Sequence, residues 1–282
     1  MNVGIAGTSA NIPSLTTMLV SAGATVTVHE PDADNAELLK SRITRNLERA
    51  ARKGNVPEGL PTDPSGRLTV VEGLNALAGC DIVLEVAGES LKAKLKLLQE
   101  LDQACAGGAV IASVTTSQSI SRLASATNRP ERVIGLHFAT PIQSARVVEV
   151  IPGLRTSEET VGRVMAALRD LDRAPVLVRN RPGFVLGRVS QVFAGEALRL
   201  LEESGVTAET IDALARGIGF RAGPLESLDA AGLDGILAAH KALYEASGGE
   251  PRYRPHVRLV EMVDAGLLGR KSGRGFYAHE SE

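Results

Sequence analysis

Residues 2–30 read NVGIAGTSANIPSLTTMLVSAGATVTVHE. A short apolar run at residues 2–6 stops at Gly7, residues 13–22 carry apolar side chains at helical spacing, and residues 26–29 form a run rich in β-branched residues. This order predicts a strand, a turn, a helix and a second strand within about thirty residues, which is one βαβ unit. The chain is therefore expected to begin with a parallel sheet.

The same alternation continues along the first two thirds of the chain. Strands are expected at residues 68–71, 82–84, 109–112, 133–136, 146–150 and 176–178, and helices at residues 35–53, 91–104 and 158–171. A loop rich in Gly and Pro is expected at residues 54–66. This pattern is typical of an α/β fold with a Rossmann-like, doubly wound, mostly parallel sheet that carries helices on both faces.

The character of the sequence changes after residue 178. A polar turn at residues 179–183 is followed by helical patterns at residues 184–203, 208–217, 235–246 and 257–265. We therefore expect a dinucleotide-binding domain at residues 1–179 and a smaller, all-helical domain at residues 180–282.

The composition excludes several classes of protein. Lys plus Arg number 31 and Asp plus Glu number 33, so a net charge of −2 gives no bulk attraction to nucleic acid or to a membrane surface. Aromatic residues make up 3% with no Trp, which leaves no stacking platform for single-stranded nucleic acid. No segment has the ~18 apolar residues of a membrane span, and the N-terminus is strand-like rather than a secretory leader. We expect a cytoplasmic protein.

Two cysteines, Cys80 and Cys105, occur in the chain. Two are too few for a disulfide framework, and the sequence has no Cys-x-x-Cys or His-x-x-x-His spacing that would suggest zinc. We expect two buried thiols and no metal site.

The turn after the first strand departs from the usual dinucleotide fingerprint. A Gly-x-Gly-x-x-Gly sequence lets backbone N–H groups at a helix N-terminus approach a pyrophosphate closely. Gly7 is present, but Ser9 and Ile12 occupy the other two glycine positions, so a nucleotide site and an ordinary βα turn fit this turn equally well. Glu30 ends the second strand at the spacing expected of a carboxylate that binds the adenosine ribose of NAD; a merely exposed carboxylate is the alternative.

Several motifs follow in a fixed order over nearly the whole chain. In the first domain they are VLEVAGESL at residues 83–91, ASVTTS at 112–117, GLHFATP at 135–141 and VVEVI at 147–151. In the second domain they are RPGFV at residues 181–185, GPL at 223–225, GLD at 232–234 and GLLGRKSGRGFY at 266–277. In all of these motifs the chain resembles the 3-hydroxyacyl-CoA dehydrogenase family.

The resemblance implies an enzyme that uses NAD to oxidise the 3-hydroxyl of an acyl group carried on coenzyme A or on a carrier protein. His137 matches the family's His that removes the hydroxyl proton, and Glu149 matches the Glu that orients this His. A His–carboxylate pair at neighbouring strand ends suits a general base near neutral pH. Thr116 matches the Ser whose hydroxyl contacts the substrate oxygen, and Glu89 is retained in the loop beside the nicotinamide.

Other positions depart from the family pattern. Gly187 stands where the family has the Asn that completes the site, and Val114 and Thr140 replace two further Asn residues. Since the glycines of the first turn are also replaced, we predict NAD binding that is weak, or absent until substrate is present, with NAD preferred over NADP. Lys94 is expected on a solvated helix face.

Three functions stay open at this point, ranked in the following order. The first is a specialised NAD-dependent dehydrogenase. The second is a related enzyme that uses the same His–Glu pair for proton transfer without hydride transfer, as in enolisation, dehydration or cyclisation. The third is a non-catalytic acyl-thioester binder or structural protein, as the related lambda-crystallins suggest.

The resemblance also implies a homodimer. We expect its contact at an apolar helical face that includes Val185, Val189, Val192 and Phe193, although these side chains could instead lie in the core.

Overall fold

The computed structural model describes residues 1–52, 64–105, 107–139, 141–143, 145–203 and 205–280. The chain divides into two compact units, Met1–Arg181 and Pro182–Glu282, each of which is described by itself below. Among the described residues, no helix is both long enough and apolar enough to span a membrane. The expected loop at residues 54–66 lies mostly outside the described residues.

The first unit is built on one eight-stranded sheet in the order β3-β2-β1-β4-β5-β6-β7-β8. The strands are β1 (Asn2–Gly7), β2 (Thr25–His29), β3 (Leu68–Val71), β4 (Ile82–Val86), β5 (Val110–Val114), β6 (Val133–Phe138), β7 (Val147–Pro152) and β8 (Ala174–Leu177). Neighbouring strands are parallel except for β6 and β7, which are antiparallel. The strand order reverses between β1 and β4, and open α/β sheets bind ligands at the carboxyl ends of the strands at such a point.

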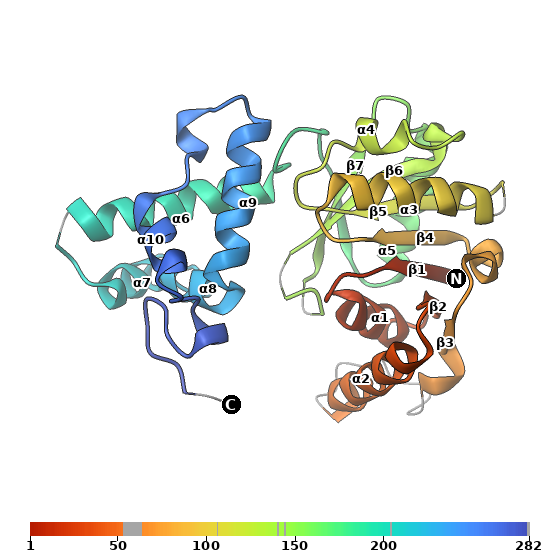
Figure 1. The fold of residues 1–282 in the computed structure, drawn as a ribbon, viewed down its shortest axis with the longest axis horizontal. Helices are drawn as coiled ribbons and strands as arrows, with labels where there is room; N and C mark the ends of the chain where they lie inside the picture. The colour runs from red at the N-terminus through yellow and green to blue at the C-terminus, as the bar shows by residue number, and fades with distance from the viewer. Residues whose placement is uncertain (53–63, 106, 140, 144, 204, 281–282) are drawn as a thin grey trace. The chain divides into compact units, whose positions relative to one another are not determined.

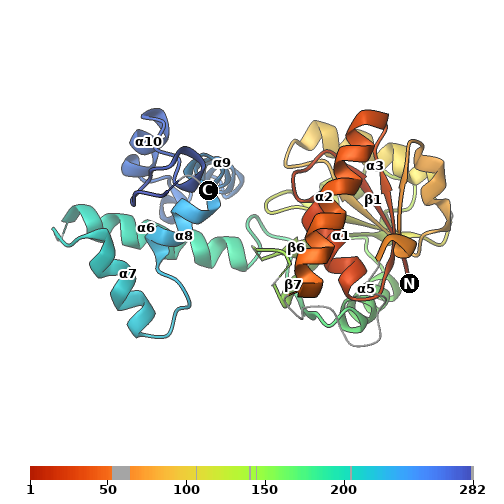
Figure 2. The same cartoon turned by 90° about the horizontal axis from the view of Figure 1, so that it is seen from below.

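Helices cover both faces of this sheet (Figures 1 and 2). They are α1 (Ile12–Ser21), α2 (Ala33–Arg52), α3 (Leu91–Ala104), α4 (Ile120–Ala124) and α5 (Glu158–Asp170). Leu136 of β6 packs in one apolar cluster with Leu15 of α1 and Val164 of α5, which places these two helices on the same face. Helices α3 and α4 lie on the opposite face (Figure 1). The predicted doubly wound, mostly parallel sheet is therefore confirmed, and Cys80 and Cys105 are buried free thiols as expected.

The second unit is helical. Its helices are α6 (Leu186–Glu203), α7 (Ala208–Gly217), α8 (Pro224–Ala231), α9 (Leu233–Ala246) and α10 (Val257–Asp264). Their apolar faces meet in one core cluster, which includes Leu198, Ile211, Leu225, Leu237 and Leu259. The predicted helical domain is confirmed, with α8 as a helix that the sequence pattern did not predict.

Two buried carboxylates organise this helical unit. Asp212 of α7 accepts hydrogen bonds from the backbone N–H groups of Leu225 and Glu226 at 2.9 and 2.8 Å, so it caps the start of α8 from a different helix. Asp229 of α8 accepts from the backbone N–H of Tyr277 at 2.9 Å and also binds the ring of His279. The GPL and GRGFY motifs therefore have a structural role here, as segments held by buried acids.

Burial of His240 on α9 predicts that the stability of the protein depends on pH. Its side chain is buried, and burial lowers its pKa from 6.5 to about 4. As the pH falls from about 6.5 to about 4, the unfolded chain takes up a proton that the native state does not, so stability decreases, by up to about 3 kcal/mol. We expect thermal unfolding over this pH range to show a larger loss of Tm for wild type than for His240→Leu. Identical pH profiles of the two proteins would contradict this prediction.

Candidate active site

His137 and Glu149 lie directly opposite each other on the antiparallel strands β6 and β7. Nδ1 of His137 lies 2.6 Å from Oε2 of Glu149, and the two residues are 8% and 4% exposed. Their neighbours Leu136 and Val148 belong to the core on the α1 face. Because side chains alternate along a strand, His137 and Glu149 point to the other face of the sheet.

The contact between these two residues selects one form of the imidazole ring. An ionised carboxylate can only accept hydrogen bonds, so Nδ1 of His137 carries the proton donated to Glu149. Nε2 is then the basic nitrogen of the ring. The pair has the chemistry of a general base whose conjugate acid is stabilised by a buried negative charge.

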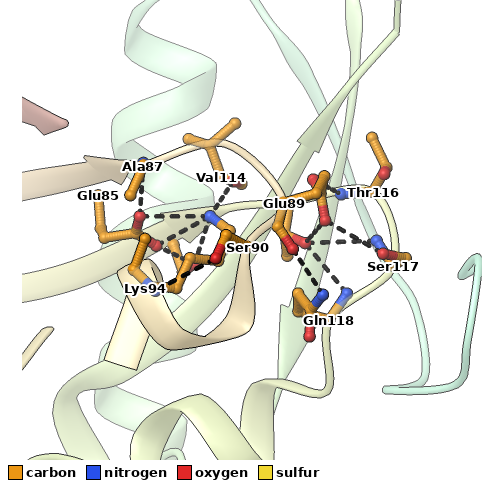
Figure 3. A network of polar contacts seen from close by, with 12 residues as sticks. Glu85, Ala87, Glu89, Ser90, Lys94, Val114, Thr116, Ser117 and Gln118 are labelled. Atoms are coloured by element: carbon orange, nitrogen blue, oxygen red, sulfur yellow. Dashed lines mark hydrogen bonds and ion pairs between the residues drawn. The ribbon is translucent and has the colours of Figure 1, made fainter. Parts of the chain in front are cut away.

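Thr116 lies just beyond β5, beside β6. The backbone N–H of Thr115 donates to the carbonyl of Leu136 at 3.1 Å, which fixes this loop against the strand that carries His137. Glu89 holds the same loop from the other side: its carboxylate accepts from the backbone N–H of Thr116 at 2.8 Å and from the hydroxyl of Thr115 at 2.8 Å (Figure 3). The structure thus joins the predicted residues Glu89 and Thr116 through a direct hydrogen bond.

Lys94 corrects one sequence expectation. It is 0% exposed rather than solvated, and its Nζ lies 3.0 Å from Oε2 of Glu85, which is also 0% exposed (Figure 3). The ammonium also donates to the carbonyl of Val114 at 2.7 Å. A buried lysine is tolerated when a buried carboxylate neutralises it and its donors are satisfied, and here both conditions hold.

Glu85 is the centre of this second polar cluster. Besides Lys94, it binds the backbone N–H of Ala87 at 2.7 Å and the hydroxyl of Ser113. The cluster therefore connects the carboxyl ends of β4 and β5 with the first turns of α3. Sequence reasoning missed both Glu85 and Lys94. The available signal was a carboxylate inside the apolar run 82–86 and a lysine four residues before the buried Leu98.

The first βα turn fits a dinucleotide at two points. Gly7 has φ +140°, and a Cβ there would lie 2.3 Å from the carbonyl of Val86, so this position requires glycine. Glu30 follows β2, and its backbone N–H donates to the carbonyl of Val71 at 2.9 Å, which fixes its main chain at the end of β2, while its carboxylate accepts from the backbone N–H of Asp32 at 3.2 Å. Gly7 would allow close approach of a pyrophosphate and Glu30 would bind a ribose hydroxyl.

The same turn departs from the usual site at the two replaced glycines. Ile12 is buried in the core at the start of α1, so its side chain is accommodated between helix and sheet. The hydroxyl of Ser9 accepts a hydrogen bond from the backbone N–H of Asn11 at 3.2 Å. The residues therefore fit NAD in the approach to the phosphates and in the ribose carboxylate, although several backbone donors of the turn already have acceptors within the protein.

The remaining predicted positions belong to the second unit or lie outside the described residues. Gly187 is in the first turn of α6, where a Cβ would meet nothing within 4 Å. Val185, Val189 and Val192 are exposed, so the interpretation of these three as core residues was wrong. Thr140 lies outside the described residues.

Comparison with known proteins identifies the family of each unit. Residues 3–181 match the NAD binding domain of 3-hydroxyacyl-CoA dehydrogenase, and residues 183–279 match the C-terminal domain of the same family. A 3-hydroxybutyryl-CoA dehydrogenase of Bradyrhizobium diazoefficiens is 36% identical over 276 residues, which cover 98% of this chain and 94% of that protein.

Two further relatives agree with this assignment. The mitochondrial hydroxyacyl-coenzyme A dehydrogenase of Rattus norvegicus is 32% identical over 92% of this chain and 85% of its own length. The crystal structure of (S)-3-hydroxybutyryl-CoA dehydrogenase from Ralstonia eutropha has a TM-score of 0.91 and 33% identity, and the match covers 99% of each chain. The chain belongs to the 3-hydroxyacyl-CoA dehydrogenase family of NAD-dependent oxidoreductases, and it carries that family's NAD-binding and C-terminal domains in order.

Proposed function

We propose that the protein oxidises the 3-hydroxyl of a 3-hydroxyacyl-CoA, with His137 as the general base. The observation that carries this proposal is the buried contact between His137 Nδ1 and Glu149 Oε2. Nε2 of His137 accepts the hydroxyl proton as the C–H bond of the same carbon gives up its hydride. Glu149 keeps Nδ1 protonated and stabilises the imidazolium that results. NAD, when bound, supplies the hydride acceptor.

Thr116 and the first turn complete the proposed division of roles. The hydroxyl of Thr116 binds the substrate oxygen, and the contact from its backbone N–H to Glu89 supports a fixed position for it. Gly7 would hold the pyrophosphate of NAD, because a Cβ is excluded there, and Glu30 would hold its adenosine ribose, because its carboxylate directly follows β2.

The first substrate to test follows from the names of the relatives. Two of them are 3-hydroxybutyryl-CoA dehydrogenases, so acetoacetyl-CoA with NADH is the appropriate pair in the reducing direction. We expect consumption of NADH that depends on acetoacetyl-CoA. Acceleration of the exchange of the C2 protons of acetoacetyl-CoA with deuterated water above the uncatalysed rate, without any consumption of NADH, would contradict the redox proposal and favour the proton-transfer alternative.

We further propose that the helical unit forms a homodimer through α6 and α7. Val189 on α6 is 63% exposed, Ile218 just after α7 is 78% exposed, and the rings of Phe193 on α6 and Phe220, two residues after Ile218, stack with their centroids 4.5 Å apart. A monomer seldom exposes several large apolar side chains on adjoining helices, so these residues support burial against a second copy.

This interface gives a further prediction. We expect wild type to sediment as a dimer at micromolar concentration, and the double variant Val189→Glu with Ile218→Glu to sediment as a monomer, because two charges would be buried in an apolar contact. Leu154→Glu changes an exposed leucine of the other unit and is the control that stays dimeric. A monomeric wild type would refute the interface.

A further inference from the structure

The backbone N–H groups of the first turn are largely paired within the protein. Thr8 and Ser9 both donate to the carbonyl of Val86, at 3.1 and 3.0 Å, and Ile12 donates to the carbonyl of Ser9 at 3.1 Å. Pro13 has no N–H to donate. The turn thus begins α1 with fewer open donors than a helix N-terminus usually offers to an anion.

The N–H of Asn11 is paired differently from these groups. Its acceptor is a side chain, the hydroxyl oxygen of Ser9, at 3.2 Å. The glycine that the dinucleotide fingerprint places at position 9 has no side chain, so with glycine this N–H would have no acceptor from residue 9 and would face an incoming phosphate. The serine therefore adds an intramolecular acceptor where the fingerprint leaves a donor for the ligand.

We propose that the Ser9 hydroxyl competes with the pyrophosphate of NAD for the Asn11 N–H, and so sets the cofactor affinity of this protein. This inference rests on the proposed NAD-dependent function. A phosphate oxygen must replace Ser9 Oγ at Asn11 before the turn can bind it fully, and this exchange lowers the net gain from binding. The competition therefore lowers the affinity for NAD without abolishing NAD binding.

Backbone strain does not account for the effect of residue 9. Among the described non-glycine residues, positive φ angles are found at Asp172 and Phe184, so Ser9 has a backbone conformation that any residue can adopt. Gly7 is different, because a Cβ there would collide with the backbone of Val86. Because a Cβ is tolerated at residue 9 but not at residue 7, we predict that removal of the Ser9 hydroxyl oxygen alone, with the Cβ retained, is enough to strengthen cofactor binding.

The test is calorimetric titration of NADH into the full-length protein in three forms: wild type, Ser9→Ala and Ser9→Gly. The loss of one competing hydrogen bond is expected to tighten the Kd about three- to tenfold in Ser9→Ala, with Ser9→Gly at least as tight. Ser157→Ala is the matched control, because the Ser157 hydroxyl likewise accepts a backbone N–H, from Thr160 at 3.1 Å, but does so at the start of α5. Its Kd is expected to equal that of wild type.

A second readout follows the Asn11 amide itself. In the absence of NADH, its ¹⁵N–¹H signal is expected to shift in Ser9→Ala, because the hydroxyl acceptor is removed. Addition of NADH is expected to shift this signal in all three forms, because a phosphate oxygen then accepts from the Asn11 N–H.

The other outcomes overturn the inference. Weaker binding by Ser9→Ala would show that the hydroxyl is a ligand for the phosphate. Tighter binding by Ser9→Gly alone would assign the effect to the bulk of the Cβ. Equal binding by all three forms would remove Ser9 from cofactor recognition and leave the proposed dehydrogenase function intact, whereas no binding by any form, with or without acetoacetyl-CoA present, would overturn both.

Discussion

Replacement of His137 by alanine is expected to lower kcat for 3-hydroxyacyl-CoA oxidation by about 10²–10⁴-fold, the usual cost of losing a positioned general base. The hydroxyl proton would then have to leave to water while hydride transfer proceeds. Initial rates of acetoacetyl-CoA-dependent NADH consumption measure the same step in reverse, where the imidazolium of His137 returns the proton. The effect should fall on kcat rather than on the Kd for NADH, because the cofactor residues are untouched.

Glu149→Gln provides the graded comparison. It keeps the shape of the side chain opposite His137 but removes the charge that stabilises the imidazolium, so the loss of kcat is expected to be smaller than in His137→Ala. His256→Gln serves as the control, since His256 lies 3.8 Å from the carboxylate of Glu202 in the helical unit. Wild-type turnover in both His137→Ala and Glu149→Gln would refute the proposed base.

Lys94→Met is expected to destabilise the first unit by about 3–5 kcal/mol, because it leaves the Glu85 carboxylate buried without its cation. Methionine fills much of the space of the lysine stem, so the cost comes from the unpaired charge rather than from a cavity. The measurement is urea unfolding at neutral pH, followed by circular dichroism. Loss of the contact from Nζ to the Val114 carbonyl would add to the effect.

Two variants isolate this contribution. Lys96→Met removes a lysine of the same helix whose partner, Glu100, lies 3.7 Å away in an exposed pair, and it is expected to change stability by less than about 1 kcal/mol. Adding Glu85→Gln to Lys94→Met should restore part of the lost stability, because the buried site then holds no net charge. If Lys94→Met and Lys96→Met destabilise equally, the buried pair contributes no more than an exposed one.

The centre of the sheet was predictable from sequence because its strands are buried and mostly apolar. All six residues of β6 and all five of β4 are buried, and such runs are recognised without knowledge of their neighbours. The direction of a strand is not encoded in such a run. Residues 147–151 read equally well as parallel or antiparallel, so the direct pairing of His137 and Glu149 became visible only in the structure.

The remaining differences come from contacts between residues distant in sequence. Lys94 was assigned to solvent on its charge alone, although its spacing from Leu98 and Leu101 places it on the buried stripe of α3. Helix α8 has eight residues, and its first N–H groups are capped by Asp212 of another helix. The residues next to Lys94 in sequence do not reveal that Glu85 is its partner. The residues of α8 likewise do not reveal that Asp212 caps this helix.

The antiparallel pairing of β6 with β7 also limits where single residues can be inserted into or deleted from this chain. Since alternate residues of a strand face opposite sides, a slip of β7 by one residue against β6 would turn Glu149 toward α1 and set a valine opposite His137. Catalysis would then be lost although the codons for His137 and Glu149 are unchanged. In descendants of this chain, the loss of one codon near the start of β7 is therefore as direct a route to an inactive protein as the substitution of the histidine itself.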